Sequence, residues 1–292
     1  YPNTPGRRKP AYSPQKPQSS IMSSGYTNRF GAYLLEQNLS PNTIQSYDYS
    51  VKQFYKLFHR LTSSNLRAYK LYLLEHHKPQ TVNLRIQAIN TYLKYRESAI
   101  APIAPVRVQR KTFLDRIISQ ADYEYLIRRL YEDEKFTYYY IVRLITATGV
   151  RVSELITFQV EDAAAGEKDI YSKGNKVRRV YIPTRLRDSL MEWTARENRR
   201  SGTLFLNRFG DPLTASGIRI QLKAFAQRYG LSEDVMYPHS FRHRFAKNFI
   251  EKCGDIALLS DLLGHDSIET TRIYLRRSST EQAAIVNRIV KW

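Results

Sequence analysis

Apolar residues recur at helical spacing through two stretches near the start of the chain. The first stretch follows Ser40 and Pro41, a capping residue and a proline suited to the first helical position. Its apolar members are Ile44, Tyr47, Val51, Phe54 and Phe58. The members of the second stretch are Val82, Ile86, Ile89 and Leu93. Each pattern matches the buried face of an amphipathic helix, so residues 26–98 are predicted to form a four-helix domain.

The second half of the chain combines helical spacing with a short alternating pattern. The predicted helices cover residues 121–131, 136–147 and 152–158 and the chain from residue 214 onward. Residues 169–172 and 177–182 alternate apolar and polar positions around a Lys-Gly-Asn-Lys turn, which predicts a β-hairpin. Residues 203–206 are predicted to add a third strand. We therefore expect a helical domain with a small antiparallel sheet.

Two segments interrupt these patterns. Residues 1–25 contain five prolines, four basic residues, no acidic residue and almost no large aliphatic side chain. This composition predicts a disordered basic arm, which either follows DNA phosphates or is a solvated leader. Residues 99–112 contain Pro102 and Pro105 and are predicted to be a linker. The prediction is a mainly α, two-domain protein, with helical residues 26–98 followed by an α+β domain at residues 113–292.

The charge of the chain is strongly positive. Its 292 residues include 46 Lys and Arg against 27 Asp and Glu, which gives a formal net charge of +19. Such an excess predicts a polyanionic partner. The sequence has no run of 18 apolar residues and no secretory signal, which favours nucleic acid over a membrane. Cys253 is the single cysteine, so no intrachain disulfide can form, and we expect a cytoplasmic, nucleoid-associated protein.

Basic residues are concentrated where DNA contact is expected. Residues 26–100 hold ten basic and four acidic residues, an imbalance that a merely solvated helix face does not require. Arg244 is expected to leave its helix on a different face from Arg242, as a surface residue or a contact to the DNA backbone. The predicted DNA-binding residues are Lys52, Lys56, Arg85, Arg107, Arg110, Lys111 and Arg244.

The candidate chemistry lies near the end of the chain. His239 and Arg242 are three residues apart on a predicted helix, so both side chains can converge on one small anion. Arginine offers a planar fork of donors to two phosphate oxygens, and histidine exchanges a proton near neutral pH. Tyr274 follows and becomes a nucleophile once its hydroxyl is deprotonated. These residue types together indicate covalent phosphoryl transfer to tyrosine.

Two upstream segments complete this set, with Arg151 as a second arginine and Lys173 as a proton donor at the predicted turn. The four segments are ATGVRVSEL at 147–155, SKGNK at 172–176, HSFRH at 239–243 and LLGHDSIETTRIY at 262–274. In this order they resemble the motifs of the tyrosine recombinase (phage integrase) family. The resemblance runs from about residue 26 to the C-terminus.

The resemblance implies a chemical role for four of these residues. Tyr274 would be the nucleophile, forming a 3′-phosphotyrosyl bond and leaving a free 5′-hydroxyl. Arg151 and Arg242 would clamp the non-bridging oxygens of the scissile phosphate and stabilise the transition state. Lys173 would protonate the leaving 5′-oxygen.

The remaining motif residues are expected to assist. By the same resemblance, His239 is the candidate base for Tyr274 and His265 a donor to the phosphate, while Glu154 and His243 are placed in supporting roles. No metal and no other cofactor are implied. Transfer to a protein hydroxyl conserves the bond energy, and the sequence has neither a carboxylate cluster for Mg²⁺ nor a P-loop.

The family implies a site-specific DNA recombinase or integrase acting on double-stranded target sites. It would act as a tetramer through a Holliday junction, for integration or excision of a mobile element or for Xer-like resolution. Residues 280–292 have apolar positions at helical spacing, and we expect this tail to dock in trans on a neighbouring protomer; accessory proteins are a further allowed partner. Two alternatives stay open: a DNA-binding protein without catalysis, and a relaxing enzyme like a type IB topoisomerase.

Overall fold

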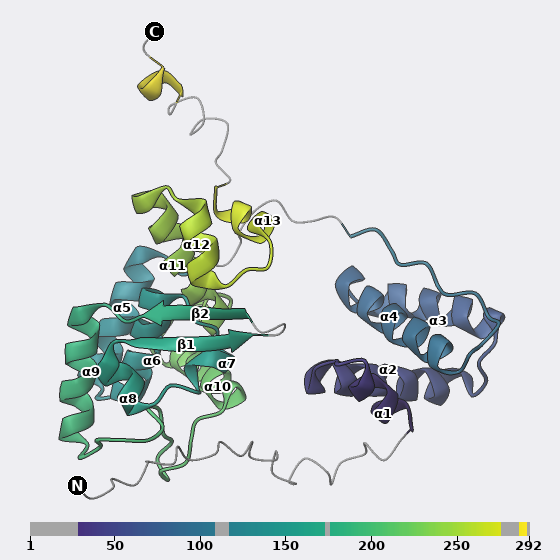
Figure 1. Cartoon of the computed structure of the whole chain (residues 1–292), viewed down its shortest axis with the longest axis horizontal. Helices are drawn as coiled ribbons and strands as arrows, with labels where there is room; N and C mark the ends of the chain where they lie inside the picture. The colour runs from purple at the N-terminus through teal and green to yellow at the C-terminus, as the bar shows by residue number, and fades with distance from the viewer. Residues whose placement is uncertain (1–28, 109–116, 173–175, 276–285, 291–292) are drawn as a thin grey trace, which may run out of the picture. The chain divides into compact units, whose positions relative to one another are not determined.

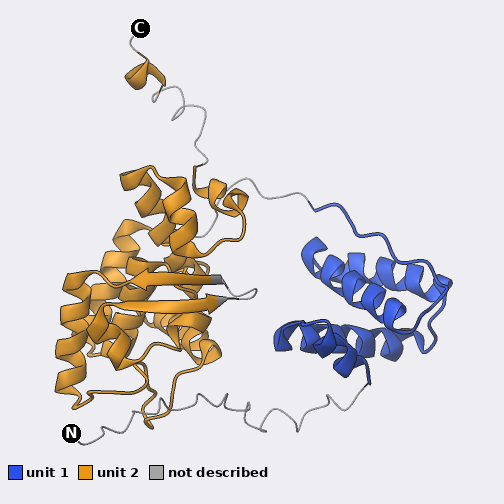
Figure 2. Ribbon diagram, in the orientation of Figure 1, with its two compact units in different colours: residues 1–110 blue, residues 111–292 orange. Residues whose placement is uncertain are grey.

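The computed structural model describes residues 29–108, 117–172, 176–275 and 286–290 (Figure 1). The chain divides into two compact units, residues 1–110 and residues 111–292, and each unit has its own hydrophobic core (Figure 2). The predicted basic arm at residues 1–25 lies outside the described residues, as do Arg110 and Lys111 in the predicted linker.

Unit 1 contains the helices α1 (Arg29–Glu36), α2 (Pro41–Phe58), α3 (Ser63–His76) and α4 (Pro79–Tyr95). The start of α2 follows the capping signal, because the Ser40 hydroxyl accepts a hydrogen bond from the Thr43 N–H at 3.3 Å. Both predicted apolar stripes face the core of the unit, except that Phe58 is only half-buried. Tyr69 of α3 is fully buried and packs edge-on against Phe54 of α2.

The chain after α4 turns back along the unit that it leaves. Asn90 bonds both polar groups of the Ile103 backbone, at 2.9 and 2.8 Å. Asn83 does the same with Val106, again at 2.9 and 2.8 Å. The amine of Lys70 donates to the Ala104 carbonyl at 2.7 Å. The first part of the predicted linker is therefore attached to unit 1 by side chains of α3 and α4.

Unit 2 begins with α5 (Gln120–Glu132), α6 (Phe136–Thr148), α7 (Val152–Leu155), α8 (Val160–Ala165), β1 (Glu167–Ser172) and β2 (Lys176–Tyr181). It continues with α9 (Thr184–Arg196), α10 (Ala215–Tyr229), α11 (Pro238–Cys253), α12 (Ile256–Leu263), α13 (Ile268–Thr271) and the 3-10 helix η2 (Arg272–Leu275). The predicted fold class, mainly helical with a small antiparallel sheet, is confirmed.

The predicted hairpin is present, but the predicted third strand is not part of the described sheet. β1 and β2 pair antiparallel from Glu167↔Tyr181 to Ser172↔Lys176. Thr203 makes only an isolated bridge with Gln159. The guanidinium of Arg199 donates to the carbonyls of both Thr203 and Leu204, so these acceptors are satisfied by a side chain instead of a neighbouring strand.

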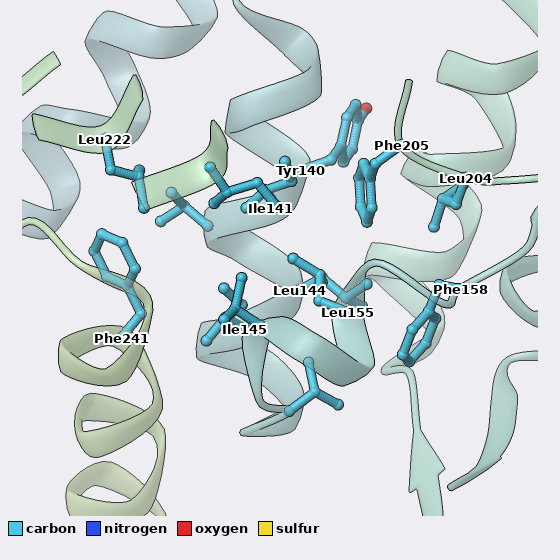
Figure 3. Packing of buried hydrophobic residues seen from close by; sticks show 14 of the residues in the cluster. Tyr140, Ile141, Leu144, Ile145, Leu155, Phe158, Leu204, Phe205, Leu222 and Phe241 are labelled. Carbon is cyan, nitrogen blue, oxygen red and sulfur yellow. The ribbon is translucent and has the colours of Figure 1, made fainter. Parts of the chain in front are cut away.

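Helix α6 is the central element of the unit 2 core (Figure 3). Its residues Ile141, Leu144 and Ile145 are fully buried, and side chains from the surrounding elements pack around them. These surrounding residues include Leu155, Phe158, Leu204, Phe205, Leu222 and Phe241. The helix predicted over residues 152–158 is shorter than expected: α7 ends at Leu155, and Phe158 turns into this core.

Gly149 ends α6 in the left-handed conformation, at φ 68°. Its N–H caps the helix by bonding to the Ile145 carbonyl at 2.8 Å. A Cβ at this position would collide with the side chains of Phe245 and Leu263, so only glycine permits this close approach of α6 to α11 and α12. The turn brings the next residues of the chain, including Arg151, against the ends of those helices.

Candidate active site

Side chains from five parts of unit 2 converge beside the C-terminus of α12. Arg151 and Glu154 come from the turn after α6 and from α7. The other contributions are Arg178 from β2, His239, Arg242 and His243 from α11, His265 after α12, and Tyr274 from η2. The structure thus brings together every motif residue predicted from the sequence except Lys173, which lies outside the described residues.

Glu154 is the acceptor at the centre of this cluster. Its carboxylate accepts hydrogen bonds from the backbone N–H of Arg151 at 2.8 Å and from the Arg151 guanidinium at 3.0 Å. It also accepts two bonds from Arg178, at 2.9 and 2.6 Å. Burial alone would raise the pKa of Glu154, but the hydrogen bonds from Arg178 and Arg151 outweigh it and lower the pKa below its ordinary value. Glu154 is therefore a carboxylate anion, only 13% exposed, between two arginines.

Arg178 is a member of the cluster that sequence reasoning missed. It pairs with Ile170 in the hairpin register, and Ile170 is buried against the core. A charged residue at an inward-facing strand position was the available signal, because such a residue needs a buried partner. The side chain of Arg178 is only 10% exposed, and Glu154 is that partner.

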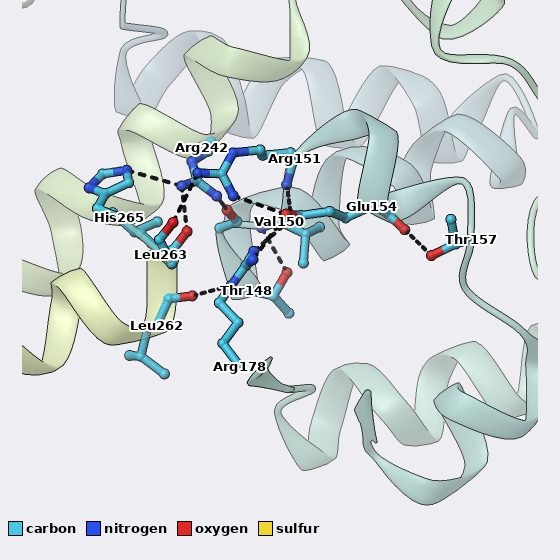
Figure 4. Close-up of polar contacts among 12 residues, drawn as sticks. Thr148, Val150, Arg151, Glu154, Thr157, Arg178, Arg242, Leu262, Leu263 and His265 are labelled. Carbon is cyan, nitrogen blue, oxygen red and sulfur yellow. Dashed lines mark hydrogen bonds and ion pairs between the residues drawn. The ribbon is translucent and has the colours of Figure 1, made fainter. Parts of the chain in front are cut away.

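Three consecutive carbonyls at the C-terminus of α12 each accept a hydrogen bond from a different arginine (Figure 4). The carbonyl of Leu262 accepts from Arg178 Nε at 3.1 Å, that of Leu263 from Arg242 Nη2 at 2.7 Å, and that of Gly264 from Arg151 Nη2 at 3.1 Å. The last carbonyls of a helix have no partner within the helix and carry its partial negative charge. The end of α12 thus gathers three guanidinium groups that would otherwise repel one another.

Arg242 is the most deeply buried of these arginines, with 2% of its surface exposed. It donates to the Gly149 carbonyl as well as to Leu263, so its orientation is fixed from two sides. Burial first, and the charge of Arg151 second, lower the pKa of Arg242 to about 10. The group remains a cation at neutral pH.

His265 is locked in one tautomer by its two neighbours. Its Nε2 lies 3.1 Å from Nη2 of Arg242, which can only donate, so Nε2 is the acceptor. The proton is then on Nδ1, which lies 2.8 Å from the Thr271 hydroxyl. Burial and the charge of Arg242 lower the pKa of His265 to about 4. In this arrangement the predicted phosphate donor is neutral, and its Nε2 is engaged with Arg242.

Tyr274 is 8% exposed, and its hydroxyl lies 2.6 Å from Nδ1 of His243. Burial raises the pKa of Tyr274 to about 12, although the charge of Arg242 opposes the shift. Burial, followed by the neighbouring His239, lowers the pKa of His243 to about 4. The resting pair is therefore a protonated phenol hydrogen-bonded to a neutral imidazole.

His239, the predicted base, occupies a different position. Its ring lies 4.6 Å from the ring of His243, centre to centre, and its side chain is exposed to solvent. Loss of hydration and then the charges of Arg242 and Arg151 lower the pKa of His239. The structure thus gives the direct hydrogen bond to Tyr274 to His243, which the sequence had placed among the supporting residues.

The prediction that Arg244 lies on the surface is wrong, since the residue is 6% exposed. Its guanidinium lies over the ring of Tyr123 at 4.5 Å from the centroid and donates to Gln120. Helix α11 packs inside unit 2, so the face opposite Arg242 is also covered by protein. A surface residue and a contact to the DNA backbone both require an exposed side chain, and Arg244 does not have one.

The other predicted DNA-binding residues that the structure describes lie in unit 1 and the chain leaving it. Lys52 and Lys56 are exposed on α2, and Lys52 forms an ion pair with Asp48 at 2.6 Å. Arg85 of α4 is half-buried and lies over the ring of Tyr49 at 4.8 Å. Arg107 is exposed.

Neither a metal cluster nor a membrane span was found where the structure describes the chain. No three His, Cys, Asp or Glu side chains gather within reach of one ion among the described residues. Likewise, none of the described helices is both long enough and apolar enough to cross a membrane.

Comparison with known proteins identifies relatives that cover most of the chain. Residues 114–281 match the model of the phage integrase family. The tyrosine recombinase XerC of Herpetosiphon aurantiacus is 31% identical over 277 residues, covering 86% of this chain and 90% of that protein. XerC of Staphylococcus epidermidis is 28% identical over 269 residues, with 85% and 90% covered.

Solved structures share the fold. The XerH site-specific recombinase bound to its difH substrate has a TM-score of 0.67 at 20% identity, covering 87% of this chain and 82% of that chain. A lambda integrase tetramer bound to a Holliday junction has a TM-score of 0.67 at 16% identity, with 86% and 77% covered.

Proposed function

Because the chain belongs to the phage integrase family and is a tyrosine recombinase of the Xer-like type, we propose that it recombines DNA at specific sites through a covalent bond to Tyr274. One observation carries this proposal. The buried phenol of Tyr274 is hydrogen-bonded to an imidazole and lies in the field of Arg242, whose charge favours the phenolate. A structural tyrosine has no need of either neighbour.

In the proposed cleavage step, the Tyr274 oxygen attacks the scissile phosphorus. The bond between the phosphorus and the 5′-oxygen of the next nucleotide breaks, and a 3′-phosphotyrosyl bond forms. Arg151 and Arg242 bind the non-bridging oxygens, which carry more charge in the transition state than in the ground state. The leaving 5′-oxygen takes a proton from Lys173, and attack by a 5′-hydroxyl of the partner strand reverses the sequence.

His243 is the proposed acceptor of the phenol proton. In the tautomer that carries its proton on Nε2, the Nδ1 of this neutral imidazole is a free acceptor within hydrogen-bond reach of the hydroxyl. The pKa values of about 12 for Tyr274 and about 4 for His243 are too far apart for the proton to transfer in the resting site. Transfer then accompanies formation of the phosphorus–oxygen bond, with a bound phosphate anion raising the basicity of the imidazole.

We assign His239 and His265 to the phosphate. His239 is exposed beside the two arginines, where an anion replaces water. His265 must release Arg242 before its Nε2 can face an oxygen, because that nitrogen accepts from the guanidinium in the resting site. Binding of the phosphate to Arg242 supplies a competing acceptor for the same N–H groups.

The proposal also includes an oligomeric state on DNA. We propose a homotetramer on two duplexes, passing through a Holliday junction, and the lambda integrase tetramer bound to such a junction supports it by shared fold. Val286, Ile289 and Val290 are exposed at helical spacing, which suits docking of the tail on a neighbouring protomer. Integration or excision of a mobile element, Xer-like resolution, and help from accessory proteins belong to this proposal.

The test is covalent capture. The protein is incubated without metal or ATP with nicked duplexes tiled across its native locus, and adducts are separated on a denaturing gel. The wild-type chain is expected to form an adduct that maps to Tyr274. Tyr274→Phe is expected to bind the same DNA with unchanged affinity and to form none, because it lacks the nucleophilic oxygen.

Tyr171→Phe is the matched control, since Tyr171 is a 76% exposed tyrosine on β1 of the same unit. It is expected to form the adduct at the wild-type rate. An adduct that persists in Tyr274→Phe would assign the nucleophile to another tyrosine.

A further inference from the structure

Arg178 has no part in the chemistry described so far, yet it makes three hydrogen bonds inside the site. Two go to separate oxygens of Glu154 and one to the carbonyl of Leu262. We infer that Arg178 is a positioning residue, which occupies Glu154 so that Arg151 stays directed at the scissile phosphate. This inference rests on the proposed function.

The carboxylate of Glu154 has no vacant acceptor site in the structure. A carboxylate has about four lone-pair sites, and here four N–H donors fill them. Oε1 accepts from Arg151 Nη1 and Arg178 Nη1, while Oε2 accepts from the Arg151 backbone and Arg178 Nη2. Without Arg178, two sites on a buried anion become vacant, and the nearest cation that can fill them is Arg151.

The guanidinium of Arg151 is held between Glu154 and the end of α12. Only one of its terminal nitrogens contacts Glu154, and the other donates to the Gly264 carbonyl at 3.1 Å. Its side chain remains 38% exposed, against 10% for Arg178. A bidentate pair with Glu154 would remove Nη2 from Gly264 and turn the fork away from the phosphate.

The pairing of Arg178 with Glu154 also determines how much positive charge faces the phosphate. Arg178 and Glu154 form a neutral pair, so the two positive charges of Arg151 and Arg242 are not offset within the cluster. Removal of Arg178 alone would let the charge of Glu154 neutralise Arg151. The attraction for a phosphate oxygen would fall accordingly.

The close fit at Gly264 shows that Arg178 is held in place. A Cβ on Gly264 would lie 2.7 Å from Cδ of Arg178 and 2.9 Å from its Nη1. The guanidinium therefore crosses directly over the backbone at the end of α12, where its Nε finds Leu262. Any residue with a Cβ at position 264 would therefore displace the Arg178 side chain.

The experiment measures single-turnover adduct formation at saturating protein, together with the dissociation constant for the DNA. Arg178→Met is expected to slow adduct formation about 10- to 100-fold, the usual size of an effect exerted through a neighbouring residue. Its dissociation constant is expected to stay within about twofold of wild type, because the Arg178 side chain is only 10% exposed and its guanidinium is bonded to Glu154 and Leu262. Arg178→Lys keeps the charge without the fork and should fall between the two.

A double variant separates positioning from a general loss of structure. Arg178→Met with Glu154→Gln removes both charges of the pair, so Arg151 is no longer attracted to an unpaired carboxylate. This double variant is expected to react at least about 3-fold faster than Arg178→Met alone. Arg179→Met is the matched control, because Arg179 is the next residue of β2, is exposed, and pairs with Glu167 and Asp169 outside the site.

A crystal structure of the Arg178→Met protein gives a readout that does not depend on cleavage. Arg151 is expected to leave the Gly264 carbonyl and to bond both oxygens of Glu154. An unmoved Arg151, or a double variant slower than Arg178→Met, overturns the inference. A wild-type protein that forms no adduct overturns the proposed function instead, and the position of Arg151 in the variant still decides the inference.

Discussion

At the scale of single residues, the nucleophile depends on how its neighbour is protonated. The phenol of Tyr274 donates to His243 when Nδ1 of the imidazole carries no proton, and this is the tautomer that the proposed cleavage step requires. The same hydrogen bond can serve to hold the phenol, to accept its proton, or both. An asparagine distinguishes these roles, since its amide can accept the hydrogen bond near the Nδ1 position but is not a base.

His243→Asn is therefore expected to keep Tyr274 in place and to lose proton acceptance. The rate of adduct formation should fall about 10²- to 10⁴-fold, the usual contribution of a general base. The measurement is the single-turnover rate on a nicked duplex at saturating protein. His59→Asn is the control, because His59 is exposed in unit 1 at φ 55°, a conformation that asparagine tolerates.

A wild-type rate in His243→Asn would limit His243 to holding the phenol. The base would then be sought at His239, whose ring lies next to that of His243. Normal DNA binding with an unchanged melting temperature is required of the variant for either reading.

Sequence reasoning found the residues whose type and spacing carry the chemistry, such as Arg151, Arg242 and Tyr274. It did not find the pairing of His243 with Tyr274 or of Arg178 with Glu154, whose members are 31 and 24 residues apart. Contacts over such distances are set by how the helices pack, which residue type does not encode. The error at Arg244 has the same origin.

At the scale of elements, the short helix α12 organises the site through its last turn. Gly264 ends it in the left-handed conformation at φ 62°, and the three arginines meet at the carbonyls there. Gly254 ends α11 in the same way at φ 74°, but a Cβ added to it would meet no other atom within 4 Å. Both glycines thus have a positive φ, and the clear difference between them is in their surroundings.

Gly264→Ala and Gly254→Ala form a matched pair. Each places a Cβ in the left-handed region, which costs about 1–2 kcal/mol of stability. Only Gly264→Ala should also displace Arg178, so only it should slow adduct formation, by about tenfold or more. Thermal melts measure the stability loss that both variants share. Single-turnover cleavage measures the slower adduct formation that is expected only for Gly264→Ala. Equal cleavage rates for the two variants would show that the position of Arg178 over Gly264 is not needed for adduct formation.

Elements with a strong local signal were predictable, and those decided by a neighbour were not. The hairpin follows from alternation around a glycine-containing turn, and α2 from its cap and proline. Residues 203–206 have equally apolar side chains, yet Arg199 satisfies two of their carbonyls and no strand pairs there. The competing donor was a side chain whose position the sequence pattern does not give.

At the scale of the whole molecule, two separate cores predict two unfolding transitions. Residues 1–110 and 111–292 bury different apolar clusters, and units of this kind commonly unfold independently. His243 and His265, whose pKa values are lowered to about 4, both belong to unit 2. Acid should therefore destabilise unit 2 through these two groups and through His239 of the same unit, whose pKa is also lowered.

The direction follows from proton binding. An unfolded histidine has a pKa of about 6.5, so between pH 6.5 and 4 the unfolded chain binds more protons than the native one. The stability that these neutral histidines contribute is complete above pH 6.5 and is lost as the pH falls toward 4. From pH 7 to pH 5 the loss is about 2 kcal/mol for each histidine, which corresponds to a melting temperature lower by on the order of 10 °C for both.

Differential scanning calorimetry of the whole chain at pH 7 and pH 5 checks this prediction. His243→Asn should remove part of the acid shift of the unit 2 transition, because asparagine does not titrate. His59→Asn should leave the shift unchanged, since His59 is exposed and belongs to unit 1. If His243→Asn shows the full wild-type shift, the imidazole of His243 is not held neutral by its burial, and its assignment as an unprotonated acceptor for Tyr274 fails with it.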